Sequence, residues 1–143
     1  MVPITGPLVA AKGCQKYWGS QLLNKCVVPK NITRCGKLTE IPDKDFGPMI
    51  IYPNGAREPA VILPGGEGYF NTDLLIYVNS INDLQCGGKN VGESGTIAFA
   101  NSCQYDQYDR TTIGTINFCP NIITPDPQLF DKYLAVALHE LTQ

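Results

Sequence analysis

The stretch PDPQLFDKYLAVALHELTQ (Pro125–Gln143) decides the fold that we expect for this chain. Its first residues are a helix-start signal, because Asp126 can cap a helix and Pro127 suits the first helical position. Apolar residues then recur at helical spacing on more than one face, namely Leu129, Phe130, Tyr133, Leu134, Val136, Ala137, Leu138 and Leu141. This pattern predicts one helix buried inside a domain.

The composition is that of a folded protein. Of 143 residues, 17% are charged and 43% are hydrophobic, where soluble domains average roughly 25% charged residues. The length predicts a single domain over residues 1–143, with a Cys-, Pro- and Gly-rich region at 1–58 and a core of sheet and helix at 59–143. The net charge is -2 and no stripe of Lys and Arg is present, which excludes nucleic acid as a partner class. No apolar run reaches the roughly 18 residues of a membrane span.

The cysteines predict an oxidising compartment. None of the six forms a C-x-x-C pair, which argues against a zinc knuckle and for disulfides; they are Cys14, Cys26, Cys35, Cys86, Cys103 and Cys119. Pairing of Cys86 with either Cys103 or Cys119 would link loops around the predicted strands, and the sequence leaves that choice open. Asn31-Ile32-Thr33 is an N-glycosylation acceptor. We therefore expect a secreted, lumenal or cell-surface location.

Short strands separated by turns are expected before the helix. Residues 49–52 and 60–63 predict a hairpin. Pro64-Gly65-Gly66-Glu67-Gly68 predicts a tight turn rather than a phosphate cradle, because no Lys-Ser or Lys-Thr follows. Residues 73–79 are almost continuously apolar, which predicts the central strand of a sheet, buried on both faces.

Two further strands are expected at 95–101 and 113–119. In the first, Ile97 and Phe99 alternate onto one face as core residues, and an edge position suits the strand. Between the two strands, Asp106 and Asp109 lie three residues apart. The calcium loop that such acids can indicate is missing its terminal Glu, so a solvated turn is predicted.

Several ordered motifs carry a resemblance to a known family. They are Asn71-Thr72-Asp73 leading into Leu74–Val78, Gly95–Ala100 with Cys103-Gln104, Gly114–Asn117 with Cys119-Pro120, and Val136 with His139-Glu140. These segments, within about residues 59–143, resemble the catalytic domain of the leishmanolysin family of zinc metalloendopeptidases. The segment Val2–Leu8 and the three cysteines that follow resemble the cysteine-containing region upstream of that domain.

The resemblance implies an α+β fold, the N-terminal subdomain of a zincin or metzincin, with a twisted mixed sheet packed on the active-site helix and stabilised by disulfides. In the family an extended peptide substrate lies antiparallel to an edge strand. By order, that strand is residues 95–101, so its backbone is the expected substrate-binding element, formed by Gly95, Thr96, Ile97, Ala98, Phe99 and Ala100.

The metal-binding pattern on the helix is incomplete. H-E-x-x-H supplies two zinc ligands because positions i and i+4 of a helix point the same way, and its Glu serves as the general base. By resemblance, His139 is a zinc ligand and Glu140 the base, while Gln143 occupies the second ligand position. An amide oxygen is a poor zinc ligand beside imidazole, and His139 is the only histidine. We therefore expect this chain to hold no catalytic zinc and to be inactive by itself.

Three interpretations of the incomplete motif stay open. The sequence is a fragment of a larger peptidase, with a missing C-terminal segment, or a degenerate family member that uses its surface for binding, or one part of a site that a second chain completes. Both ends resemble cut points in the family's domain, which favours the fragment. The alternative function is a secreted, non-catalytic binding or structural module.

Overall fold

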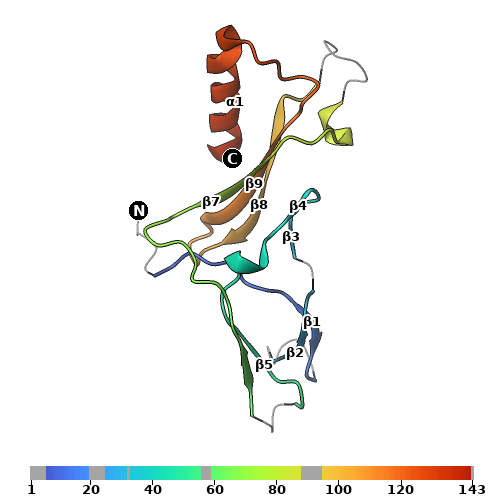
Figure 1. Ribbon diagram of the computed structural model, residues 1–143, viewed down its shortest axis with the longest axis vertical. Helices are drawn as coiled ribbons and strands as arrows, with labels where there is room; N and C mark the ends of the chain where they lie inside the picture. The colour runs from blue at the N-terminus through green and yellow to red at the C-terminus, as the bar shows by residue number, and fades with distance from the viewer. Residues whose placement is uncertain (1–5, 20–24, 32, 56–58, 88–94, 143) are drawn as a thin grey trace. The chain divides into compact units, whose positions relative to one another are not determined.

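The computed structural model describes residues 6–19, 25–31, 33–55, 59–87 and 95–142 (Figure 1). The chain divides into two compact units. The first comprises Met1–Arg34 and Glu40–Asp73, and the second comprises Cys35–Thr39 and Leu74–Gln143. The fold is mixed α+β, with small sheets and one α-helix in the described residues. The expectation of a single domain over residues 1–143 stays a prediction, and the two units are described separately below.

The first unit consists of short antiparallel pairs around a small core. β1 (Cys14–Tyr17) pairs with β2 (Cys26–Pro29), and β5 (Met49–Ile51) pairs with β6 (Val61–Leu63), which confirms the hairpin predicted from the sequence. A 3-10 turn, η2 (Asp43–Asp45), lies between the two pairs along the chain. The buried apolar side chains are those of Leu8, Ala10, Cys26, Ile41 and Phe46.

The glycines of Pro64–Gly68 allow two backbone segments to approach closely and do not form the predicted tight turn. The structure shows no turn there, and Gly66 N donates a hydrogen bond to Phe46 O at 2.7 Å. A Cβ on Gly66 would lie 1.7 Å from Lys44 O, and one on Gly65 would lie 2.2 Å from the carbonyl carbon of Gly47. The tight-turn prediction is therefore wrong, because glycine is needed here for close approach of two backbone segments.

The second unit contains a three-stranded mixed sheet in the order β7-β9-β8 (Figure 1). β7 (Leu75–Asn79) runs parallel to β9 (Thr111–Phe118), and β8 (Ala98–Tyr105) runs antiparallel to it. A 3-10 turn, η3 (Leu84–Cys86), follows β7. The short strands β3 (Arg34–Cys35) and β4 (Thr39–Glu40) form a separate pair, whose connecting residues belong to this unit.

The prediction for the central strand is wrong. β7 lies at an edge of the sheet and none of its residues is buried; Val78 is 65% exposed. β9 is central, and all residues from Thr112 to Asn117 are buried. An apolar run shows that a strand could be covered on both faces, but strand order depends on which partners pair with it. The edge position expected for the strand at residues 95–101, which overlaps β8, is confirmed.

All six cysteines form disulfides, as predicted. The pairs are Cys14–Cys26, Cys35–Cys103 and Cys86–Cys119. The open choice for Cys86 is thereby decided in favour of Cys119, and both residues are fully buried. Cys103 lies at a bulge in β8, where the pairing with β9 slips by one residue. Its disulfide therefore anchors β8 at an irregular point in the ladder.

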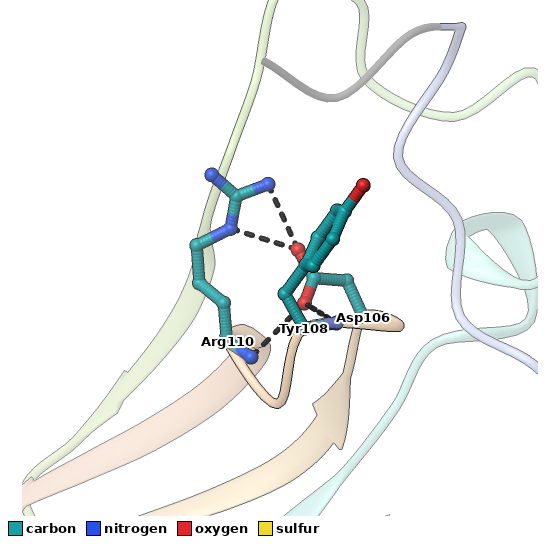
Figure 2. A network of polar contacts seen from close by, with 3 residues as sticks. All are labelled: Asp106, Tyr108 and Arg110. Carbon is teal, nitrogen blue, oxygen red and sulfur yellow. Dashed lines mark hydrogen bonds and ion pairs between the residues drawn. The ribbon is translucent and has the colours of Figure 1, made fainter. Parts of the chain in front are cut away.

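The turn between β8 and β9 lies where the sequence predicts one, but of its two acids only Asp109 is exposed; the Asp106 side chain is 9% exposed and is bonded within the turn (Figure 2). The Asp106 carboxylate accepts hydrogen bonds from the backbone N–H groups of Tyr108 (2.9 Å) and Arg110 (3.0 Å). The Arg110 guanidinium completes an ion pair with it at 2.8 Å. Burial acts to raise the pKa of Asp106, but these donors outweigh it and hold the pKa below its usual value. Asp109 adopts a left-handed conformation, with φ 59°.

The C-terminal helix begins as the sequence predicts. Asp126 accepts a hydrogen bond from Gln128 N at 2.9 Å, and Pro127 occupies the first position of a 3-10 turn, η4 (Pro127–Leu129), that leads into α1 (Phe130–Thr142). The expectation of a helix buried on more than one face is wrong, since no residue of α1 is buried. Among the described residues, no helix is long and apolar enough to cross a membrane.

Candidate active site

His139 and Glu140 lie in the last turn of α1. The His139 side chain is exposed, and Glu140 is half-buried. Thr142 Oγ1 donates a hydrogen bond to the backbone carbonyl oxygen of His139 at 3.0 Å, which closes the turn. Gln143, at the predicted second ligand position, lies outside the described residues.

The two apolar stripes of the helix have different environments. The half-buried residues of α1 and the turn before it recur every three or four positions and form one stripe: Leu129, Tyr133, Val136, Ala137 and Glu140. α1 makes its main strand contacts with β8. The second stripe, formed by Phe130, Leu134, Leu138 and Leu141, is 44–63% exposed. Glu140 therefore lies on the half-buried stripe, and His139 lies outside both stripes.

The predicted substrate strand lies only partly within β8. Ala98, Phe99 and Ala100 belong to β8, whereas Gly95, Thr96 and Ile97 precede it. The predicted core role of Ile97 and Phe99 needs correction, since both are half-buried, and Ala98 between them is the buried residue, at 4% exposure. Their alternation fits one covered face, but within the described part of the chain β8 has a neighbouring strand on one side only, which leaves large side chains partly open.

The residues before β8 are held by the turn that contains Cys86. Thr96 N donates a hydrogen bond to Cys86 O at 2.8 Å. A Cβ on Gly95 would lie 2.6 Å from the same oxygen, so glycine is required at this position. The backbone N–H of Thr96 is therefore already bonded within the unit.

Among the described residues β8 pairs only with β9, so the other edge of its backbone has no partner strand there. Cys119 N donates to Ile97 O at 2.8 Å, which makes the residue pair 97 and 119 a hydrogen-bonded pair of the antiparallel ladder. Hydrogen-bonded and non-hydrogen-bonded pairs alternate, so Ala98 and Ala100 direct their N–H and C=O groups away from β9. These two residues can therefore offer hydrogen bonds to an added strand.

A buried polar network behind the sheet was not predicted from the sequence. Thr115 Oγ1, on β9, donates to Tyr77 O at 3.0 Å and shares a 3.0 Å hydrogen bond with Thr39 Oγ1. Asn79 Nδ2 also donates to Thr39 Oγ1. The segment Cys35–Thr39 is therefore fixed at both ends. Its first residue forms a disulfide with Cys103 on β8, and its last residue bonds to Thr115 on β9. No local signal identifies it, because the partners are far apart along the chain.

The described residues do not bring a full set of zinc ligands together. Catalytic zinc requires about three protein ligands. The described residues contain no group of three His, Cys, Asp or Glu side chains that could hold a metal ion. All cysteines are engaged in disulfides, and His139 is the only histidine of the sequence. His139 and Glu140 can thus supply at most part of a site.

A pocket of about 640 Å³ lies at the other end of the helix. It is lined by Thr124, Pro125, Asp126, Pro127, Phe130 and Tyr133. The Tyr133 hydroxyl oxygen accepts a hydrogen bond from Thr124 N at 3.0 Å, and contacts with the Thr124 side chain and backbone lower the pKa of this hydroxyl. His139 lies nine residues beyond Phe130, roughly 13 Å along the helix axis. The pocket is therefore separate from the His-Glu pair.

Comparison with known proteins identifies the family of this chain. Residues 64–143, more than half of the chain, match the family model described as leishmanolysin. The chain belongs to the leishmanolysin family. This is a family of zinc metallopeptidases, so the resemblance drawn from the sequence is confirmed. The zincin-like details of the expected fold stay a proposal.

Individual leishmanolysin relatives are much longer than this chain. The mouse (Mus musculus) ciliated left-right organizer metallopeptidase is 28% identical over 99% of this chain and 21% of its own length. Its Xenopus laevis counterpart is 28% identical over 90% and 18%, respectively. A leishmanolysin-like peptidase of Drosophila melanogaster is 31% identical over 53% of this chain and 10% of its own length. The chain thus spans about a fifth of these relatives at most. No solved structure matches it.

Proposed function

We propose that this chain is part of a leishmanolysin-type zinc metalloendopeptidase domain and contributes the sheet and the active-site helix to peptide-bond hydrolysis by the intact domain. One observation carries the proposal. The open edge strand β8 is the strand that α1 contacts most, and α1 carries His139-Glu140 in its last turn. A peptidase needs a surface that holds an extended peptide near its metal-binding helix, and this unit combines the two.

Within that domain, His139 acts as a zinc ligand and Glu140 as the general base. Gln143 stands where the second histidine ligand is expected, and a neutral amide oxygen is a weak substitute for imidazole. The 143-residue chain by itself therefore binds no stoichiometric zinc and cleaves no peptide. A missing C-terminal segment or a partner chain would have to supply further ligands.

Zinc content and peptidase activity test this part of the proposal. We expect the purified chain and its His139→Ala variant to hold equal, substoichiometric zinc by mass spectrometry. Neither should cleave a fluorescent casein substrate above background. One tightly bound zinc in the parent chain, together with chelator-sensitive cleavage that His139→Ala abolishes, would show that the chain is a working peptidase.

The substrate of the intact domain is an extended peptide that pairs with β8. Ala98 and Ala100 supply the outward N–H and C=O groups, and added main-chain hydrogen bonds give affinity with little dependence on side chains. The six residues 95–100 were predicted as one binding strand. Ala98–Ala100 are the part of it that supports the proposal best, since Thr96 N already bonds to Cys86 O.

Residue-resolved hydrogen exchange can test strand addition without catalysis. A peptide of about ten residues should protect the amides of Ala98 and Ala100 and leave Phe99 unchanged, because Phe99 already pairs with β9. The matched control is the same peptide N-methylated at alternate residues, which removes its donors on one edge. Equal protection by both peptides would show that the contact is not strand addition.

A second function is favoured by one observation, the exposed stripe Phe130, Leu134, Leu138 and Leu141 on α1. Such a stripe suits a secreted, non-catalytic binding or structural module that another chain completes. Leu134→Gln with Leu138→Gln should then release a partner that the parent chain retains through native purification. Retention by both forms would remove the support for this alternative.

The proposed location is secreted, lumenal or on the cell surface. Its support is the pairing of all six cysteines, because disulfides persist in oxidising compartments. Expression with and without a secretory leader checks it: the three disulfides should form in the secreted chain and be missing from the chain retained in the reducing cytosol.

A further inference from the structure

Positive charge is concentrated at the start of the chain. The first 39 residues contain six of the eleven Lys and Arg residues of the sequence and none of its thirteen Asp and Glu residues. The six are Lys12, Lys16, Lys25, Lys30, Arg34 and Lys37. The chain as a whole has a net charge of -2, so this basic part is surrounded in sequence by an acidic remainder. Such an asymmetry indicates an acidic partner for the basic part.

The hairpin of β1 and β2 gathers four of these lysines along one short ladder (Figure 1). Lys16 is part of β1. At one end of the ladder Lys30 N donates a hydrogen bond to Gly13 O at 2.9 Å, and at the other end Trp18 N donates to Lys25 O at 2.8 Å. From Gly13 to Trp18 a strand spans roughly 17 Å. The sequence shows no run of Lys and Arg here, because it is the pairing of the strands that brings the lysines together.

No carboxylate of the described residues neutralises these lysines. The ion pairs found there include none of Lys12, Lys16, Lys25 and Lys30. Instead, Lys12 Nζ lies 5.7 Å from the ring centre of Phe46, and Lys25 Nζ lies 5.3 Å from that of Tyr52. The face of an aromatic ring attracts an ammonium group but does not cancel its charge. The lysines of the hairpin therefore remain able to bind an anion.

Gly13 positions the Lys30 side chain beside the ladder. A Cβ at Gly13 would lie 2.9 Å from Lys30 Cδ and 3.5 Å from Lys30 Nζ, so the lysine side chain lies across the glycine backbone. The adjacent Cys14–Cys26 disulfide holds the two strands together. Lys30 and Lys16 are both exposed. Charges on a cross-linked hairpin lose less freedom on binding than charges on a loose loop, which favours affinity.

We propose that the β1–β2 hairpin binds a sulfated polysaccharide, whose sulfate groups pair with the ammonium groups of Lys12, Lys16, Lys25 and Lys30. Sulfate esters stay ionised throughout the physiological pH range and recur along an extended chain, which suits a row of ammonium groups on paired strands. Trp18, at the end of the row, is 40% exposed. Its ring offers an apolar surface on which the C–H face of a sugar can pack.

The proposed location of the chain favours a polysaccharide over the other common polyanions. The strongly anionic leaflet of a cell membrane faces the cytosol, and nucleic acids are found mainly inside the cell. The pairing of all six cysteines supports passage through an oxidising secretory compartment instead. The choice of partner thus depends on the proposed location, whereas binding by the hairpin is independent of peptidase activity.

Titration of the parent chain with a heparin decasaccharide tests the interaction. We expect binding that weakens steeply between about 50 and about 300 mM salt, as for other polyanions that exchange counterions for ammonium groups. The same decasaccharide without its sulfate groups should not bind. Equal binding of the two oligosaccharides would overturn the proposal, and so would tighter binding of single-stranded DNA or of phosphatidylserine vesicles.

Matched lysine variants locate the binding on the hairpin. Lys16→Gln with Lys30→Gln should weaken binding about tenfold, the size expected when two exposed ion pairs are lost. Lys16→Arg with Lys30→Arg keeps both charges and should bind as the parent does. Lys44→Gln with Lys132→Gln is the control, because it removes two exposed lysines outside the hairpin. Equal weakening by the control and the hairpin variant, or parent-like binding by the hairpin variant, would overturn the proposal.

Discussion

Strand β9 and helix α1 belong to the same unit but differ in burial in the opposite sense to their composition. Apolar segments are usually the more buried ones, yet here the more polar strand is buried and the more apolar helix is not. β9 reads Thr-Thr-Ile-Gly-Thr-Ile-Asn-Phe, yet its six inner residues are all buried. α1 is rich in Leu, Val, Ala and Phe, yet none of its residues is buried. The comparison shows that burial is set by neighbours, because β9 has a strand on each side and α1 packs mainly on β8.

The largest effect is expected from removing the Cys35–Cys103 disulfide, which anchors β8, the antiparallel neighbour of β9. Cys35→Ala with Cys103→Ala should lower the free energy of unfolding by about 4 kcal/mol, since the bond closes a loop of 68 residues. Hydrogen exchange should rise throughout β8 and β9. Urea unfolding of the variant and the parent measures the difference. A change confined to the segment Cys35–Thr39 would contradict the proposed anchoring of β8.

Matched truncations on the two elements test the comparison directly. Ile113→Ala on β9 should destabilise the chain by about 3 kcal/mol, because Ile113 is fully buried and a cavity remains. Leu138→Ala on α1 should cost less than about 1 kcal/mol, because Leu138 is 54% exposed. Chemical denaturation of both variants measures the two values. Equal losses would mean that α1 is covered in solution.

A smaller, pH-dependent effect is expected at the turn that joins β8 to β9. The pKa of Asp106 is lowered from its ordinary value of 3.8, so its carboxylate stabilises the folded state above that pH, and the stabilisation is lost as the pH falls through the folded-state pKa. Asp106→Asn should therefore be less stable than the parent at neutral pH, and the gap should close as the pH falls below the folded-state pKa of Asp106.

Asp109→Asn is the control for this turn. Asp109 is exposed and has φ 59°, a conformation that asparagine also accepts. Thermal unfolding across the pH range should leave this variant close to the parent. A pH dependence that survives in Asp106→Asn would assign the effect to another acid.

The smallest effect is expected on the exposed stripe of α1. Leu134→Gln with Leu138→Gln should change the free energy of unfolding by no more than about 0.5 kcal/mol, as is usual for exposed positions. Circular dichroism during thermal unfolding measures it. A large loss would indicate that self-association covers the stripe, and sedimentation of the parent chain would then show an oligomer.

Local signals in the sequence predicted the elements better than their arrangement. Asp126 and Pro127 located the start of the helix, because capping depends on a few adjacent residues. The hairpin of β5 and β6 and the edge position of β8 were likewise predicted. The central strand was wrongly assigned to residues 73–79, because these residues are more apolar than β9. The polar Thr115 and Asn117 side chains of β9 can be buried because they bond to Tyr77 O and Ile81 O, which are distant in sequence.

The helical position of His139 and Glu140 was predicted correctly, whereas their roles as zinc ligand and base stay predictions. His139 and Glu140 do lie on a helix that contacts an edge strand. The backbone directions of Ala98 and Ala100, and the engagement of Thr96 with Cys86, depend on the register of the ladder.

The sequence by itself determined the family, the helix that carries His139-Glu140 and the pairing of the cysteines in disulfides. Each of these depends on residue identity or on neighbours a few positions apart. Only the tertiary structure decided that Cys35 pairs with Cys103, that β9 is central and that one stripe of α1 stays exposed. These features depend on contacts between residues far apart along the chain, whose pairing is selected by the packing of the whole unit.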